Sequence, residues 1–286
     1  MEPRMITLRA SSSPLSSLKS NTRGNALDTA SVAARDKFVR GRSHPAVPDV
    51  PTFKIADTLA ERTNAFALVY ENYLRAGLIE ANPDRMRVTH FHLHHATSVF
   101  IALLGEEVVA TLTLVGDSYL GIPMELVYPD EIRRMRDAKV RFAEVSSLAV
   151  AADSRRESME MFFGLNRLMG QHARMYGYQE LLIAAHPVHA RFYCSRMGFQ
   201  RMGRVRPHPS VRNHPATACH LKFDRADLDP TTYYQRVFES PLPKAVLQRR
   251  PLQQEERMIL SQAVQSQQQA MMDTWDQWEP AAETVG

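Results

Sequence analysis

Apolar positions recur at helical spacing in several segments of the chain. The clearest is residues 157–176, where Phe162, Met169 and Ala173 lie on one stripe and Gly177 follows as a stop signal. Elsewhere a capping residue or a proline opens the pattern, and a glycine closes it. Helices are therefore predicted over residues 57–77, 129–137, 157–176 and 187–198.

Runs of β-branched and apolar residues lie between these helices and predict strands. Residues 99–104 and 107–115 are joined at Gly105, a pattern typical of an antiparallel hairpin. Because strands and helices alternate, with hairpins at both ends, we expect an α/β fold whose mixed sheet is covered on its faces. The other strands are predicted over residues 53–55, 141–150, 181–185, 199–205 and 217–223.

Composition divides the chain into three parts. Residues 1–52 are rich in small and polar residues and follow no apolar period, so we expect a disordered basic tail. Residues 225–286 contain 10 glutamines and a loose apolar stripe over 252–278, which predicts a partly helical extension, either docked or solvated. The folded domain is therefore expected over residues 53–224.

Charge is concentrated in the N-terminal part. Of 35 Lys and Arg and 31 Asp and Glu, residues 1–52 hold 8 and 4, which leaves 27 of each in the rest of the chain. A domain that binds double-stranded nucleic acid normally has an excess of basic residues, and this part of the chain has none. No nucleic acid partner is therefore expected. The basic segment is either a flexible tail or an arm that docks on an acidic partner.

The length of the apolar runs and the number of cysteines indicate in which cellular compartment the protein is expected. The longest strongly apolar run, Val99 to Leu104, is far shorter than the roughly 20 residues that span a bilayer. The first residues lack the apolar core of a secretory signal, and Cys194 and Cys219 are too few for a disulfide framework. We therefore expect a cytoplasmic protein without a transmembrane segment, in which both cysteines serve packing.

The most informative stretch is AHPVHARFYCSRMGFQRMG, residues 185–203. It resembles the closing motif of the GCN5-related N-acetyltransferase (GNAT) fold, with an aromatic pair at Phe192 and Tyr193 and a turn at Gly198. The resemblance implies a mixed central sheet with splayed parallel strands, helices on both faces, and a thioester donor between the strands. It also implies that Tyr193 protonates the departing thiolate; the alternative is a core aromatic residue with a satisfied hydroxyl.

Four runs together resemble bacterial long-chain N-acyl amino acid synthases, which are related to acyl-homoserine-lactone synthases. This resemblance covers about residues 53–224 and implies no tightly bound cofactor. The implied co-substrate is an acyl thioester of acyl carrier protein or coenzyme A, and the implied acceptor is the amine of an amino acid. The four runs are RFAEVSSLAV, VVATLTLVGDS, GIPMELVYPDEI and FYCSRMGF.

Glu144 lies on the strand that flanks the donor in this fold. An ammonium is not a nucleophile, so a base must take its proton, and burial would raise the pKa of a glutamate toward that role. If the strand splays beyond Glu144, free backbone N–H groups at Ser147, Leu148 and Val150 can stabilise the oxyanion. The alternative for Glu144 is a surface or ion-paired residue.

The sequence departs from the related families in two places. The first bears on the lactone interpretation and the second on the donor. Ser147 and Thr113 stand where lactone synthases carry arginines, which weakens the lactone interpretation. The loop AADSRRESME has no glycine, so it does not form a pyrophosphate cradle. Arg155 and Arg156 in this loop are predicted to pair with a phosphopantetheine phosphate or with acidic carrier-protein residues, which favours a carrier-protein donor; the alternative is a solvated charge pair.

Four histidines, His90, His92, His94 and His95, lie within six positions. In a strand, three of them would share one face and could bind a metal, but no carboxylate or cysteine accompanies them. No metal site is predicted; these histidines either line the acceptor pocket or are ordinary loop residues. Two rival functions remain open, an acyl-homoserine-lactone synthase that consumes S-adenosylmethionine and a degenerate acyl-carrier or lipid-binding sensor.

Overall fold

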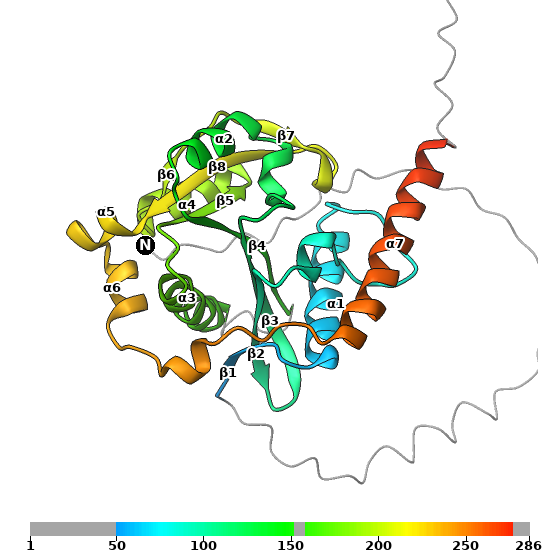
Figure 1. The fold of residues 1–286 in the computed structure, drawn as a ribbon, viewed down its shortest axis with the longest axis horizontal. Coiled ribbons are helices and arrows are strands. Elements are labelled where there is room, and N and C mark those ends of the chain that lie inside the picture. Colours follow the sequence, from blue (N-terminus) through cyan, green and yellow to red (C-terminus); the bar gives the residue numbers. More distant parts are fainter. Residues whose placement is uncertain (1–49, 152–157, 277–286) are drawn as a thin grey trace, which may run out of the picture. The chain divides into compact units, whose positions relative to one another are not determined.

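The computed structural model of the chain describes residues 50–151 and 158–276, which form a mixed α/β structure around one sheet (Figure 1). In the described residues the sheet has eight strands in the order β1-β2-β3-β4-β5-β8-β6, with β7 paired to β8. β4 and β5 run parallel, and the other described pairs are antiparallel. The strands are β1 (Thr52–Ile55), β2 (Thr97–Leu104), β3 (Glu107–Gly116), β4 (Phe142–Val150), β5 (Glu180–Ala185), β6 (Gln200–Arg201), β7 (Arg206–His208) and β8 (His214–Lys222).

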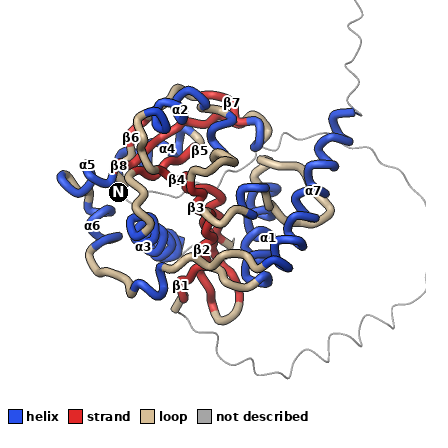
Figure 2. Tube along the Cα trace, viewed as in Figure 1, coloured by secondary structure: helices blue, strands red, loops and turns tan. Residues whose placement is uncertain are grey.

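Helices cover both faces of the sheet (Figures 1 and 2). α3 packs on one face with α6 outside it, whereas α1 packs against β3 and β4 on the other face and α7 lies beyond α1. This arrangement confirms the predicted fold class. The helices are α1 (Leu59–Arg75), α2 (Pro129–Asp137), α3 (Ser158–Met175), α4 (Pro187–Arg196), α5 (Phe223–Leu228), α6 (Thr232–Phe238) and α7 (Gln254–Asp276).

Local signals account for most of the element boundaries. Thr58 caps α1 by accepting a hydrogen bond from the Glu61 N–H at 3.2 Å, and Gly77 follows the helix with a φ of 70°. Gly105 adopts a φ of 61° in the β2–β3 hairpin, where a left-handed residue is needed. The prediction of one strand over residues 199–205 was wrong, because β6 ends at Arg201.

The segment after β8 packs onto the domain. The Gln171 amide on α3 donates to the carbonyls of Val237 and Ser240 at 2.8 and 3.0 Å, and its oxygen accepts from the Leu242 N–H at 2.7 Å. In α7, Leu260 is fully buried against the α1 side of the core. Of the two alternatives, docking matches the described side chains of the extension as far as Val264 in α7. The predicted tail over residues 1–52 lies outside the described residues up to position 49.

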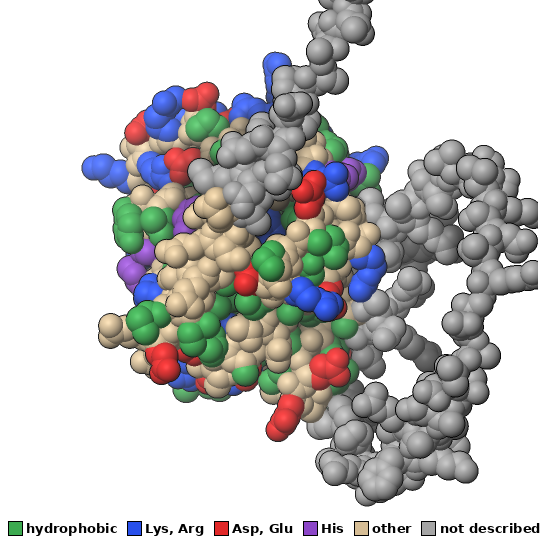
Figure 3. All heavy atoms as spheres, turned by 90° about the vertical axis from the view of Figure 1, so that its right-hand side faces the viewer, with side chains coloured by type: hydrophobic (Ala, Val, Ile, Leu, Met, Phe, Trp, Pro, Cys, Tyr) green, Lys and Arg blue, Asp and Glu red, His purple; other side chains and the backbone are tan. Residues whose placement is uncertain are grey.

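The surface seen from the α7 side carries basic and acidic side chains interspersed (Figure 3). Among the described helices, none combines the length and the apolar character needed to cross a bilayer.

The sheet opens between β4 and β5. Their parallel pairing extends from Phe142↔Glu180 to Glu144↔Leu182 and then stops, although β4 continues to Val150. β5 meanwhile stays paired with β8 to its end. Ser147 has a φ of 53°, and the β3–β4 register shifts beside it, so a bulge bends β4 away from β5. The predicted splayed parallel strands are thus present.

Candidate active site

Glu144 lies at the point where β4 and β5 separate, which we call the fork. It is the last residue of β4 that pairs with β5. Its side chain shares a face with Phe142 and is 3% exposed. Oε2 accepts a hydrogen bond from the Met124 N–H at 2.7 Å. Burial raises the pKa of Glu144 to about 8, although the Met124 N–H acts in the opposite direction. Of the alternatives open from the sequence, a surface or ion-paired glutamate does not match this geometry.

Arg136 on α2 fixes the loop that carries Met124. It binds Asp117, just after β3, through Nε and Nη2 at 2.9 and 2.7 Å. It also binds Glu125 through Nη1 and Nη2 at 2.5 and 2.6 Å, and thereby lowers the pKa of that carboxyl. Both ends of the loop are therefore tied to one guanidinium, which holds the Met124 N–H against Glu144.

Replacing Arg136 with glutamine should weaken this restraint and raise the pKa of Glu144 further, because the Met124 N–H stabilises the carboxylate. If Glu144 is the base, the rising limb of kcat/KM moves to higher pH, and activity at pH 7 falls by up to about tenfold. A pH profile of kcat/KM measures the shift. Arg133→Gln is the matched control, since Arg133 lies on the same helix and, among the described residues, pairs with exposed Asp130 alone. An unmoved limb in Arg136→Gln would contradict the assigned role.

Ser147, Leu148 and Val150 lie on the stretch of β4 that has left β5. On the edge of β4 that faces β5, the backbone groups of this stretch pair with no described strand, so they are available to a substrate oxygen. Arg155 and Arg156, the other predicted donor-binding residues, lie outside the described residues.

Tyr193 approaches the gap from the other face of the sheet. Its ring packs on Phe199 and Phe162, with centroid separations of 5.6 and 6.5 Å, and its neighbours include Val145 and Ile183 just past the fork. Its hydroxyl makes no hydrogen bond with the described residues. Burial, helped by the nearby Tyr73 hydroxyl, raises the pKa of Tyr193 to about 12, so the phenol stays protonated near neutral pH.

A narrow apolar cavity of about 30 Å³ adjoins Tyr193 between β5, α3, α4 and α6. Four of its lining residues, Tyr233, Tyr234, Val237 and Phe238, come from the C-terminal extension. The Tyr233 hydroxyl is buried without a hydrogen-bond partner, and burial raises its pKa well above the usual value. The extension therefore contributes to the surroundings of Tyr193, which composition had not indicated.

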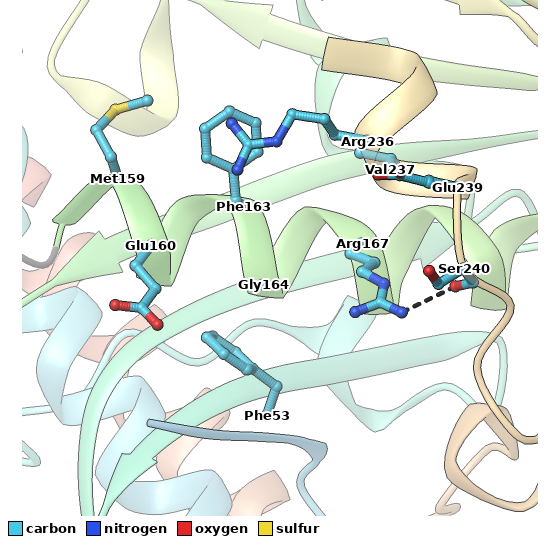
Figure 4. Close-up of a pocket in the computed structure, with 10 residues that line it drawn as sticks. All are labelled: Phe53, Met159, Glu160, Phe163, Gly164, Arg167, Arg236, Val237, Glu239 and Ser240. Carbon is cyan, nitrogen blue, oxygen red and sulfur yellow. Dashed lines mark hydrogen bonds between the residues drawn. The ribbon is translucent and has the colours of Figure 1, made fainter. Parts of the chain in front are cut away.

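A larger cavity of about 560 Å³ lies on the outer side of α3 (Figure 4). Phe53 lies below Gly164, and Arg236 stacks over Phe163 at 4.3 Å. Arg167 donates to the Ser240 carbonyl at 2.9 Å across it. Neither Glu144 nor Tyr193 lines this cavity, so it is separate from the fork.

The histidine cluster forms a short 3-10 helix, His90–Leu93, and not a strand. His92 is buried, and its Nδ1 accepts from the Thr89 N–H at 3.0 Å. The described residues contain no group of three His, Cys, Asp or Glu side chains placed to hold a metal ion. Cys194 and Cys219 are free thiols with their sulfurs 3.9 Å apart.

A sheet forked between two parallel strands, with helices on both faces, defines an acyltransferase of the GNAT-like class. The model of the family "N-acyl amino acid synthase FeeM" matches residues 64–222, more than half of the chain. The chain belongs to this family.

The solved structure of FeeM supports the fold, and two further solved structures were matched with lower scores. FeeM, an N-acyl amino acid synthase from uncultured soil microbes, has a TM-score of 0.55 and 24% identity, covering 65% of this chain and 97% of that chain. BjaI, a CoA-dependent acyl-homoserine lactone synthase solved with SAM and isopentyl-CoA, has a TM-score of 0.47 and 17% identity, covering 73% and 99%. The AHL synthase LasI has a TM-score of 0.44 and 13% identity, covering 68% and 96%. A comparison with curated proteins found no match.

Proposed function

We propose that this acyltransferase moves a medium or long acyl chain from a thioester to the amine of an amino acid by direct attack. The observation that carries the proposal is the fork itself, with Glu144 buried on one face and Tyr193 reaching it from the other. A thioester lying in the fork would meet the base on its acceptor side and the tyrosine on its sulfur side.

In the proposed reaction the ionised Glu144 carboxylate takes a proton from the acceptor ammonium. A pKa of about 8 suits this transfer, because the group is partly ionised near neutral pH and basic enough to accept the proton. The free amine then attacks the thioester carbonyl carbon, and β4 backbone N–H groups between Ser147 and Val150 that face away from β3 stabilise the oxyanion. Neither cysteine is needed as a nucleophile.

The C–S bond breaks as the tetrahedral intermediate collapses, the second nitrogen proton passes to the departing sulfur, and Glu144 releases its proton to solvent. Tyr193 donates a hydrogen bond from its hydroxyl to the departing sulfur. Its pKa of about 12 lies above that of a thiol, so its main contribution is a strong hydrogen bond to the developing thiolate. The products are an N-acyl amino acid and a free thiol.

We infer that the donor is an acyl carrier protein thioester in preference to coenzyme A. The loop AADSRRESME offers no glycine for a pyrophosphate cradle, while Arg155 and Arg156 would suit a single phosphate or the acidic surface of a carrier protein. No cofactor would be tightly bound. With such a donor the reaction would take place in the cytoplasm.

The test is an incubation of purified protein with acyl carrier protein thioesters, or separately acyl-coenzyme A, and a pool of amino acids. Intact-mass analysis should show a new N-acyl amino acid and free carrier thiol in equal amounts. Retained carrier protein without product would instead support a sensor, and a product formed only when S-adenosylmethionine is consumed would support a lactone synthase.

A further inference from the structure

Arg87 lies between α1 and the His90–Leu93 turn and has no acidic partner within the described part of the chain. Its Nε is buried and has no hydrogen-bond partner, and Nη2 makes only a long bond of 3.5 Å to the Ser210 carbonyl. No carboxylate of the described residues forms an ion pair with it. Asp84 is the nearest acid in sequence, yet it forms no ion pair with Arg87, and its Oδ2 is buried without a hydrogen-bond partner among the described residues. Glu71 pairs with Arg85 and Glu80 with Arg212, each at 3.9 Å.

The groups around Arg87 are neutral. Its guanidinium lies 4.9 Å from the centroid of the Tyr73 ring. His92 and His208 are both buried, and the proximity of Arg87 adds to the burial that lowers their pKa values. A guanidinium in such surroundings, with donors unused, is poised for an anion from outside the chain.

His92 provides a second unused donor. Because its Nδ1 accepts the Thr89 N–H, the neutral ring carries its proton on Nε2. That atom is buried without a partner, in a side chain only 8% exposed. Buried donors without acceptors are costly, and a bound carboxylate would satisfy them.

This site lies on the face of the sheet that holds Glu144. α1, which carries Tyr73, packs against β3 and β4 on that face. Tyr73 is also close enough to Tyr193 to influence its pKa, which places the neighbourhood of Arg87 beside the fork.

We propose that Arg87, with His92, binds the α-carboxylate of the acceptor and so selects free amino acids over simple amines. The proposal rests on the proposed function and adds its specificity-determining residues. The amine two bonds from the bound carboxylate would then face the fork.

The test compares an amino acid with its carboxamide, in which the charge is removed and the amine retained. For wild type, the amino acid should be the better acceptor. Arg87→Gln should lower kcat/KM for the amino acid about 10- to 100-fold, mainly through KM, and change kcat/KM for the carboxamide less than about threefold. Arg87→Lys, which keeps the charge, should lie between. Arg85→Gln is the control, because that side chain is 76% exposed, and it should alter neither substrate.

Titration calorimetry of the same amino acid with wild type and Arg87→Gln separates this proposal from the proposed function. Binding that weakens in Arg87→Gln supports the carboxylate site even if no amide product is ever found. Two results would overturn it. One is an equal loss of kcat/KM for the amino acid and for the carboxamide in a folded Arg87→Lys protein. The other is a wild-type enzyme that prefers the carboxamide.

Discussion

Glu144→Gln should lower kcat about 100- to 10,000-fold, the usual contribution of a general base. Glutamine keeps an oxygen for the Met124 N–H but cannot accept the ammonium proton. The base acts when ionised, so wild-type kcat/KM should rise with pH up to the pKa of Glu144 at about 8 and then level off. In the Glu144→Gln variant, this rise of kcat/KM with pH should be absent. Steady-state kinetics from pH 6 to 9 check both points, and an unchanged rate would remove Glu144 from the mechanism.

The same substitution should stabilise the fold at alkaline pH. Because the folded-state pKa is raised, the contribution of Glu144 to stability is fully present below its unfolded pKa, near 4.5, and is lost as pH rises through about 8. Removing the buried charge should therefore raise the free energy of unfolding at pH 9 by on the order of a few kcal/mol, with little change at pH 5. Urea unfolding at both pH values measures this.

Glu131→Gln is the matched control for that stability effect. Glu131 is equally well buried but pairs with Arg206 at 2.9 Å, so its loss should destabilise the protein. A Glu144→Gln protein that is less stable than wild type at pH 9 would mean that the carboxylate has a compensating partner.

Tyr193→Phe should lower kcat and kcat/KM together, by about 10- to 100-fold, because the hydroxyl acts only on the departing sulfur. Stability should hardly change, since that hydroxyl makes no hydrogen bond with the described residues. The defect should shrink with an aryl thioester donor, whose thiolate leaves without help. Rates with alkyl and aryl thioesters therefore identify the step that Tyr193 assists.

Tyr233→Phe is the control for Tyr193. Tyr233 lines the same cavity as Tyr193, and its hydroxyl is buried without a partner among the described residues. Unlike Tyr193, it lies outside the α4 motif. Its kcat should stay within about twofold of wild type. Equal losses in both variants, or equal losses with both thioesters, would indicate a packing effect and contradict the assigned role.

Local patterns predicted most elements, and the resemblance to the GNAT fold implied the central gap. The hairpin of β2 and β3, the helix α3 and the motif around Tyr193 were all expected within a few residues, because periodicity and caps act over short distances. The histidine segment became a 3-10 helix in which Thr89 and His92 cap each other, an arrangement that alternation did not indicate. The strand over residues 199–205 stopped early, after pairing with β8 at two positions.

By itself, the sequence determined the order of strands and helices, the residues at the fork and the type of chemistry that they allow. Only the tertiary structure decided how those residues behave. The pKa of Glu144 depends on its burial and on a backbone N–H in the loop that Arg136 holds in place, and the unused donors of Arg87 depend on which acids lie nearby in space. Burial and charge pairing join segments far apart along the chain, whereas periodicity and capping describe only neighbours in the sequence.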